Sequence, residues 1–278
     1  MGKFNFIMKK KSLAVFLIIA LFPLALHAKL IEPDGLLMKI IENNSSVSQF
    51  FLTADVKVYD PEALVPLEEE LKEAIVPYEL TDRSYSQNII FIRDEFISIE
   101  SLDSNQNALH VFIKENFRTI EINLDETRVF NYEDVFFQPI ILFTKHVQYL
   151  IRDINFLGIS NDRVSMRQEE NLFAYQLGDD KANILVHSAN YKVLSINREL
   201  QYKGRYYPLS VKILAWDEQK NKIPTHLQYF INSRLFKEVW VKTINNRGIG
   251  TKKNRLLKSY KDEITQDSFF DLLVNHAQ

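Results

Sequence analysis

The sequence predicts a mainly β protein with a few helices, built on one large antiparallel sheet that curls on itself. Long stretches of the chain alternate apolar and polar side chains, which is the period of a half-buried strand. Clusters of Asn, Asp, Ser and Gly separate these stretches, so each strand is expected to pair antiparallel with the next. Because few helices are available to cover so large a sheet, it must curl onto itself or be plugged.

The composition excludes several functional classes. The 278 residues are 46% hydrophobic and 25% charged, which is typical of a globular chain. The absence of Cys excludes a disulfide scaffold, a thiolate metal site and a Cys nucleophile, and 7 Gly argue against phosphate-binding loops. The motifs His-Glu-x-x-His, Gly-x-Ser-x-Gly and Ser-x-x-Lys are missing. We therefore predict a protein that is not an enzyme and that uses no metal or other cofactor.

The N-terminus has the pattern of an export signal. Lysines at 9–11 precede an apolar run over 13–26, and Ala28 offers a small residue at the cleavage position. The run is shorter than the roughly twenty residues of a membrane-spanning helix, and Pro23 interrupts it. We predict a cleaved signal peptide over 1–28; an uncleaved anchor is the alternative.

The first elements after the signal are a helix, a strand and an insert. Apolar residues at helical spacing over 36–41 predict a short amphipathic helix, and strict alternation over 50–58 predicts a strand. Residues 60–82 hold eight acids and one base, with leucines on one helical face. They predict an acidic helical insert, for which the alternative is a solvated charged face without a role.

Further strands are predicted wherever the alternation returns. They lie at 84–93, 95–101, 108–114, 116–124, 162–168, 171–177, 183–187, 193–202, 206–216, 223–232 and 235–245. Between the two groups, Phe143, Val147 and Leu150 lie on the apolar face of a helix predicted over 132–155. Asn232-Ser233 is expected to form a tight hairpin. These elements are assigned to one domain over 29–245.

A basic tail is predicted over 246–278. Residues 246–261 contain no acid and include four candidates for docking to an anionic membrane or an acidic partner, which are Arg247, Lys252, Lys253 and Arg255. The alternative is a solvated tail. Nucleic acid is not expected as a partner of an exported chain.

Aromatic residues supply candidates for a binding cavity. In a closed sandwich they form the core, whereas in an open curled sheet they line a cavity that accepts an acyl chain. The candidates are Phe91, Phe112, Phe143, Trp216, Tyr229 and Trp240. The sequence pattern leaves both interpretations open.

Three stretches together resemble periplasmic outer-membrane lipoprotein-sorting proteins, the LolA/LolB-like carriers. They are Ile89-Ile90-Phe91-Ile92-Arg93-Asp94-Glu95-Phe96-Ile97-Ser98-Ile99, then Ala174-Tyr175-Gln176-Leu177-Gly178-Asp179, and Lys222-Ile223-Pro224-Thr225-His226-Leu227-Gln228-Tyr229-Phe230. The resemblance spans most of 29–245.

The resemblance implies an incomplete antiparallel β-barrel, lidded by helices, whose apolar cavity holds acyl chains. It implies a periplasmic monomer that carries lipid or lipoprotein and meets an inner- or outer-membrane protein. Arg93 stands at the place of the family's Arg, whose polar contacts help to close the cavity, although Asp94 follows it where the family has Pro. The alternative on the same fold is an envelope sensor or interaction module that binds a protein partner.

Overall fold

The computed structural model describes residues 31–59, 84–115, 118–124, 138–169, 171–202, 205–217 and 222–264. The predicted signal peptide, the acidic insert at 60–82 and the start of the predicted mid-chain helix lie outside these residues.

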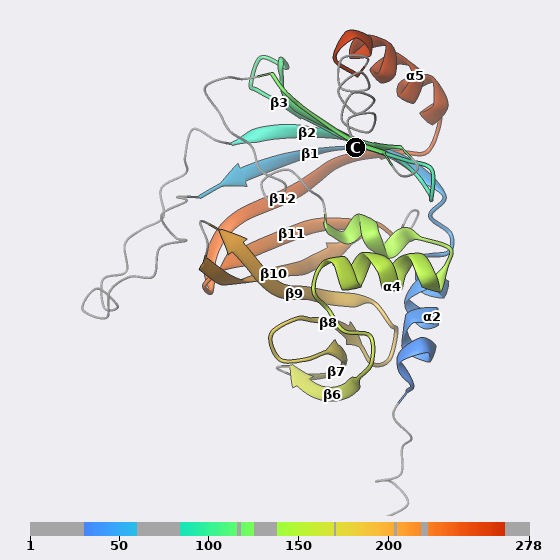
Figure 1. Ribbon diagram of the computed structural model, residues 1–278, viewed down its shortest axis with the longest axis vertical. Helices are drawn as coiled ribbons and strands as arrows, with labels where there is room; N and C mark the ends of the chain where they lie inside the picture. Colours follow the sequence, from blue (N-terminus) through green and yellow to red (C-terminus); the bar gives the residue numbers. More distant parts are fainter. Residues whose placement is uncertain are drawn as a thin grey trace, which may run out of the picture.

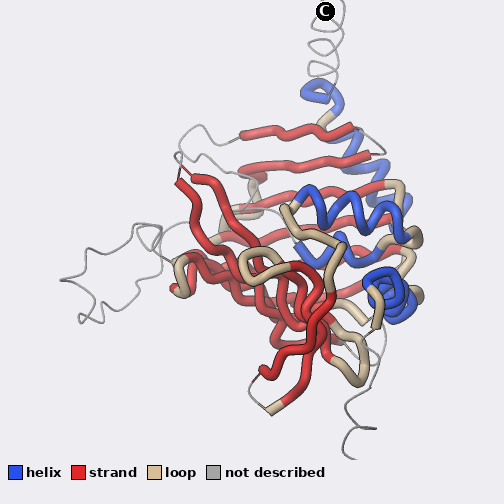
Figure 2. The backbone as a smooth tube through the Cα atoms, turned by 60° about the horizontal axis from the view of Figure 1, so that its bottom comes forward, coloured by secondary structure: helices blue, strands red, loops and turns tan. Residues whose placement is uncertain are grey.

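A single antiparallel sheet of twelve strands forms the body of the protein, in the order β5-β4-β3-β2-β1-β12-β11-β10-β9-β8-β7-β6. Figures 1 and 2 show the sheet curling on itself. Among the described residues its end strands, β5 and β6, do not pair with each other, so the barrel is incomplete. The predicted fold class is therefore confirmed.

Each predicted strand is present, with ends displaced by up to two residues. The strands are β1 (Gln49–Val58), β2 (Tyr85–Ile92), β3 (Phe96–Leu102), β4 (Ala108–Glu115), β5 (Arg118–Asn123), β6 (Val164–Glu169), β7 (Leu172–Gly178), β8 (Asn183–His187), β9 (Val193–Tyr202), β10 (Arg205–Trp216), β11 (Pro224–Ile231) and β12 (Arg234–Asn245). The predicted Asn232-Ser233 hairpin is also confirmed. Both residues have positive φ, 50° and 64°, as a tight type I′ turn requires.

The helices lie on the two faces of the β1–β5 half of the sheet (Figure 1). The inner face packs against α2 (Pro33–Asn44), the 3₁₀ helix η3 (Gln138–Phe143) and α4 (Val147–Phe156). The outer face packs against α5 (Ile249–Ser259). Two apolar clusters result, a large one inside the curled sheet and a small one under α5.

The mid-chain helix is not continuous. The sequence predicted one helix over 132–155, whereas the described part consists of η3 and α4 separated at Thr144–His146. His146 is extended, with φ −113° and ψ 126°, and its N–H donates to Thr144 Oγ1 at 3.3 Å. The hydroxyl of Thr144 in turn donates to Asp94 Oδ1 at 2.8 Å, so a bond to the β2–β3 turn holds the break in place.

Gly158 follows directly after the C-cap residue of α4. Its φ of +76° is the left-handed conformation that glycine adopts without strain. The N–H of Gly158 donates to Asn155 O at 2.9 Å, and the N–H of Ile159 donates to Ile154 O at 3.0 Å. This pair of bonds is a Schellman motif, which satisfies the last carbonyls of the helix.

A buried histidine makes the stability of the fold depend on pH. His110 on β4 is 3% exposed, and burial lowers its pKa to about 4. In the unfolded chain a histidine titrates near 6.5. As the pH falls from about 6.5 to about 4, the unfolded state binds a proton that the native state does not bind, so stability falls through this window and this contribution levels off below it.

We expect this histidine to remove roughly 2 kcal/mol of stability between pH 7 and pH 4, allowing for residual solvent screening. Urea unfolding at both pH values measures the loss. The His110→Gln variant, which cannot titrate there, should lose correspondingly less than the wild type. An equal loss in the two proteins would contradict this account.

Candidate ligand pocket

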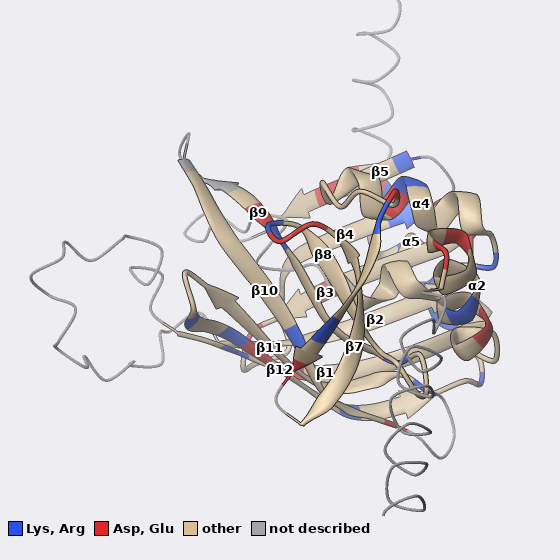
Figure 3. Ribbon diagram, turned by 90° about the horizontal axis from the view of Figure 1, so that it is seen from below, with Lys and Arg blue, Asp and Glu red and all other residues tan. Residues whose placement is uncertain are grey.

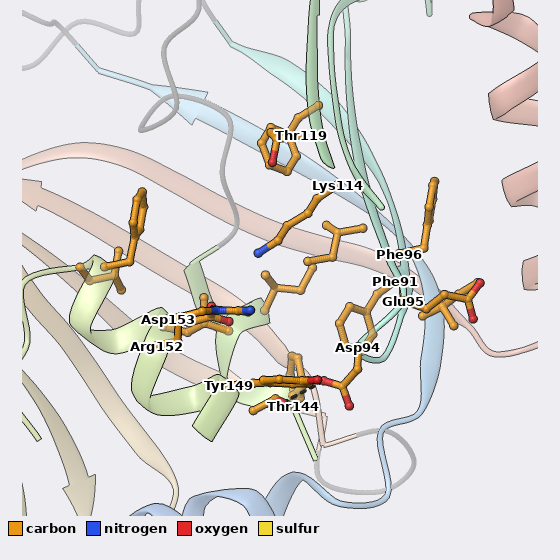
Figure 4. Close-up of a pocket in the computed structure, with 18 of the residues that line it drawn as sticks. Phe91, Asp94, Glu95, Phe96, Lys114, Thr119, Thr144, Tyr149, Arg152 and Asp153 are labelled. Carbon is orange, nitrogen blue, oxygen red and sulfur yellow. Dashed lines mark hydrogen bonds and ion pairs between the residues drawn. The ribbon is translucent and has the colours of Figure 1, made fainter. Parts of the chain in front are cut away.

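A pocket of about 780 Å³ lies between the inner face of β2–β5 and the helices η3 and α4. Figure 4 shows its lining side chains converging from the sheet on one side and from α4 on the other. The apolar lining residues are Phe91, Ile92, Phe96, Ile97, Phe112, Ile140, Ile141, Phe143, Phe156 and Leu157. The polar lining residues are Asp94, Glu95, Lys114, Thr119, Glu121, Thr144, Tyr149, Arg152 and Asp153.

Strand register aligns the apolar wall. Phe91 on β2 pairs with Ile97 on β3, and Ile99 pairs with Phe112 on β4. Because directly opposed residues leave a sheet on the same side, these side chains share the inner face. The period-two alternation that predicted the strands therefore also places these apolar side chains on one face of the sheet.

Three aromatic rings fix the helical side of the pocket to the sheet. Phe143, the last residue of η3, lies with its ring centroid 6.0 Å from that of Phe50 and 5.8 Å from that of Phe91. Phe50 and Phe91 are themselves stacked at 5.0 Å. All three are almost fully buried, so apolar packing anchors η3 to the sheet.

Three consecutive charged residues of the β2–β3 turn bind the helices on both faces of the sheet. Arg93 Nη2 donates to Asn44 O at 3.1 Å and Ser45 O at 3.0 Å, at the end of α2. Asp94 accepts from Thr144 Oγ1 at 2.8 Å and from the N–H of Lys145 at 3.3 Å, between η3 and α4. Glu95 pairs with Lys253 Nζ of α5 at 2.9 Å.

The electrostatics of this turn follow from its burial. Desolvation lowers the pKa of the Arg93 guanidinium, and the neighbouring Asp94 carboxylate partly offsets the effect. Asp94 has a positive φ of 58°, a conformation that Asp tolerates better than most residues. The departure from Arg-Pro noted in the sequence therefore gives this turn a second anchor that proline does not offer.

The aromatic candidates from the sequence divide into two groups. Phe91, Phe112 and Phe143 line the pocket together. Trp216, Tyr229 and Trp240 lie in the other half of the sheet and are not among its lining residues. Tyr229 is buried in the large core under Lys237 Nζ, and Trp240 stacks on His226 with ring centroids 5.1 Å apart. Arg93 also lies outside the lining, in the turn behind it.

The basic tail begins as the docked helix α5. Lys253 is committed to Glu95 and Glu115, at 2.9 and 2.7 Å. Burial alone would lower the pKa of Lys253, but the interactions with these two carboxylates outweigh burial, so the pKa of Lys253 is raised. Lys252 Nζ lies 3.9 Å from the centroid of the Phe51 ring. Arg247 and Arg255 remain exposed, so the predicted docking role stays a prediction that these two residues carry best.

Figure 3 shows charged residues of both signs on the helices α2, α4 and α5 and also on strands such as β7, β9 and β12. In the described part of the chain, no helix is long and apolar enough to cross a membrane, and no group of acidic or His side chains has the arrangement of a metal site.

Sequence reasoning missed several lining residues. Ile97, Ile141 and Leu157 carry no signal beyond their apolar character, because only the docking of η3 and α4 brings them to one space. Lys114 did carry a signal. It stands two residues after Phe112 on the same strand, so the period that placed Phe112 inward also places Lys114 inward.

Comparison with known proteins gives matches in structure and none in sequence. No protein-family model and no curated protein matches the chain. The chain is similar to the crystal structure of a LolA superfamily protein from Nitrosomonas europaea, with a TM-score of 0.45 and 10% identity over 76% of this chain and 93% of that one. It is similar to an outer membrane lipoprotein-sorting protein domain from Vibrio parahaemolyticus, with a TM-score of 0.43 and 8% identity over 76% and 92%.

Proposed function

We propose that this chain is an exported binding protein without enzymatic activity, which holds an acyl chain of a lipid or lipoprotein in the pocket. The pocket itself carries the proposal. Its volume of about 780 Å³ lies within the usual range for small-molecule sites, and aliphatic and aromatic side chains line both its walls. Each methylene buried there contributes about 0.8 kcal/mol, so a chain of ten or more carbons supplies ample binding free energy.

The wider role that we propose is periplasmic. A monomer with this pocket would take part in lipoprotein sorting or lipid transport by shielding acyl chains from water between membrane partners. The alternative role is an envelope sensor that binds a protein partner through its surface. The pocket favours carriage, since a surface interaction does not require a pocket with apolar walls.

Mass spectrometry tests the proposal. Protein purified without detergent from an envelope fraction is expected to carry an acyl lipid, and delipidated protein is expected to bind an acylated peptide but not the same peptide without its acyl chain. A protein that carries no lipid and has no affinity for the acylated peptide would refute acyl binding.

Opening of the pocket is assigned to the β2–β3 turn. Arg93 and Asp94 hold the end of α2 and the η3–α4 break with four hydrogen bonds, two to the exposed residues Ser45 and Lys145 and two to the buried residues Asn44 and Thr144. Hydrogen bonds of this kind contribute about 1 kcal/mol each, which is weak enough to break during ligand exchange. The hydrogen bonds of this turn therefore hold the helices of the lid, α2, η3 and α4, in the closed position, and they can break to release a ligand.

Removing the hydrogen bonds that Asp94 accepts should speed ligand release. Asp94→Gly removes the acceptors for Thr144 and Lys145 and keeps a backbone that tolerates positive φ. We expect the dissociation rate of a fluorescent fatty acid, measured by stopped flow, to rise about tenfold, which corresponds to about 1.4 kcal/mol. Asp94→Asn, which retains an acceptor oxygen and the same conformational tolerance, should stay within about twofold of wild type. Equal rates in all three proteins would show that the turn does not control release.

A further inference from the structure

Lys114 is a charged residue of the pocket that acyl binding alone does not explain. On β4 it is paired with Ile97 of β3 and Thr119 of β5, and it shares the inner face with Phe112. In Figure 4 its amine points into the pocket, toward Arg152 and Asp153 of α4. The cation therefore stands opposite the helical wall, beside the apolar floor.

The amine of Lys114 has no counter-charge in contact. Within the described part of the chain it makes no hydrogen bond or ion pair, although its side chain is half-buried. Three of the four acidic lining residues already have partners, namely Asp94 with Thr144, Glu95 with Lys253, and Asp153 with Arg152 at 2.8 Å. The fourth, Glu121, is exposed on the edge strand β5.

An ammonium group that is half withdrawn from water and unpaired favours a ligand that brings a negative charge to it. Charge-assisted hydrogen bonds to carboxylate or phosphate are about twice as strong as neutral ones. The Arg152–Asp153 pair on the facing helix is balanced, so it adds no net charge opposite the amine. An acyl chain against Phe112 and Ile97 would place its head group within reach of this amine.

We propose that the pocket selects acyl ligands with an anionic head group, a carboxylate or a phosphate, and that Lys114 binds this group. This inference rests on the proposed function, because it takes acyl binding as given. It narrows the ligand class from any acylated molecule to anionic amphiphiles, and it assigns the site of selection to one residue on β4.

Three probes of equal chain length test the selection. Dodecanoate, dodecyl phosphate and methyl dodecanoate displace a bound fluorescent probe at pH 7.5, at concentrations below micelle formation. We expect at least one of the two anions to bind ten times more tightly than the neutral ester. The order of the two anions shows whether the site suits a fatty acid or a phosphate head group.

Variants then assign the effect to Lys114. Lys114→Met should abolish the preference for anions while leaving the affinity for the ester within about twofold, and Lys114→Arg should retain the preference. Lys181→Met, which changes an exposed lysine outside the pocket, is the matched control and should bind all three probes as the wild type does.

The other outcomes overturn the inference in distinguishable ways. If the wild type binds the ester as tightly as both anions, or if Lys114→Met weakens all three probes alike, selection by Lys114 is refuted and acyl binding stands. If the wild type binds none of the three probes, the proposed function itself is refuted, and the inference with it.

Discussion

Replacing Ile97 by Asn is expected to weaken binding of acyl ligands about 20-fold, with little change in the fold. Ile97 lies half-buried on β3, in the wall of the pocket, between Phe91 and Lys114 on the neighbouring strands. An amide of similar size would face the hydrocarbon chain without a hydrogen-bond partner. Leaving a polar group buried in this way costs about 1–3 kcal/mol, and about 1.4 kcal/mol corresponds to a tenfold change in affinity.

Displacement of a fluorescent fatty acid measures this loss, and thermal unfolding checks that the variant is folded. Leu214→Asn is the matched control, because Leu214 is an exposed aliphatic residue on β10 outside the pocket. Ile97→Asn should weaken anionic and neutral ligands alike, which separates the apolar wall from the charge selection assigned to Lys114. An unchanged affinity in Ile97→Asn would mean that the acyl chain lies elsewhere.

Phe143→Ala is expected to have the largest effect on stability. The ring is fully buried and contacts Phe50 and Phe91, so its loss leaves a cavity between η3 and the sheet. Substitutions of this kind cost about 3–5 kcal/mol, a large share of the 5–15 kcal/mol that stabilises a typical domain. The midpoint of urea unfolding should fall accordingly.

The same substitution at an exposed site provides the comparison. Phe173 is 57% exposed on β7, and Phe173→Ala should change the free energy of unfolding by no more than about 0.5 kcal/mol. A loss below 1 kcal/mol in Phe143→Ala would contradict the view that this ring anchors the lid to the sheet.

The strands could be predicted from the sequence because their signal is local. Alternation within 50–58 or 108–114 requires no knowledge of neighbouring strands, and the turn residues between them carry their own signals. The same alternation placed Phe91 and Phe112 on one face. Phe143 was found through the helical spacing of its segment.

The pocket itself depended on information that is not local. Residue type alone led to the choice of Trp216, Tyr229 and Trp240 as candidates. The position of the pocket depends instead on where η3 and α4 dock, and these two helices dock over β2–β5. The break at Thr144 could not be predicted either, because the bond from its hydroxyl to Asp94 joins positions fifty residues apart.

The basic tail was predicted from its charges, and its described part includes the helix α5. The apolar residues Ile249 and Leu256 of α5, and Tyr260 directly after it, are buried on the sheet. Their spacing is helical, so this part of the fold was available from the sequence.

Photolabelling tests the central claim most directly, since it asks whether an acyl chain lies in this pocket. A fatty acid with a diazirine near the end of its chain is bound to the delipidated protein, irradiated, and located by peptide mass spectrometry. Labelling is predicted in the peptides that contain Ile97, Phe112 and Ile141, and dodecanoate should compete it away. Labelling confined to other segments, such as the exposed Met166 and Phe173 on β6 and β7, or labelling that does not respond to competitor, would contradict the account.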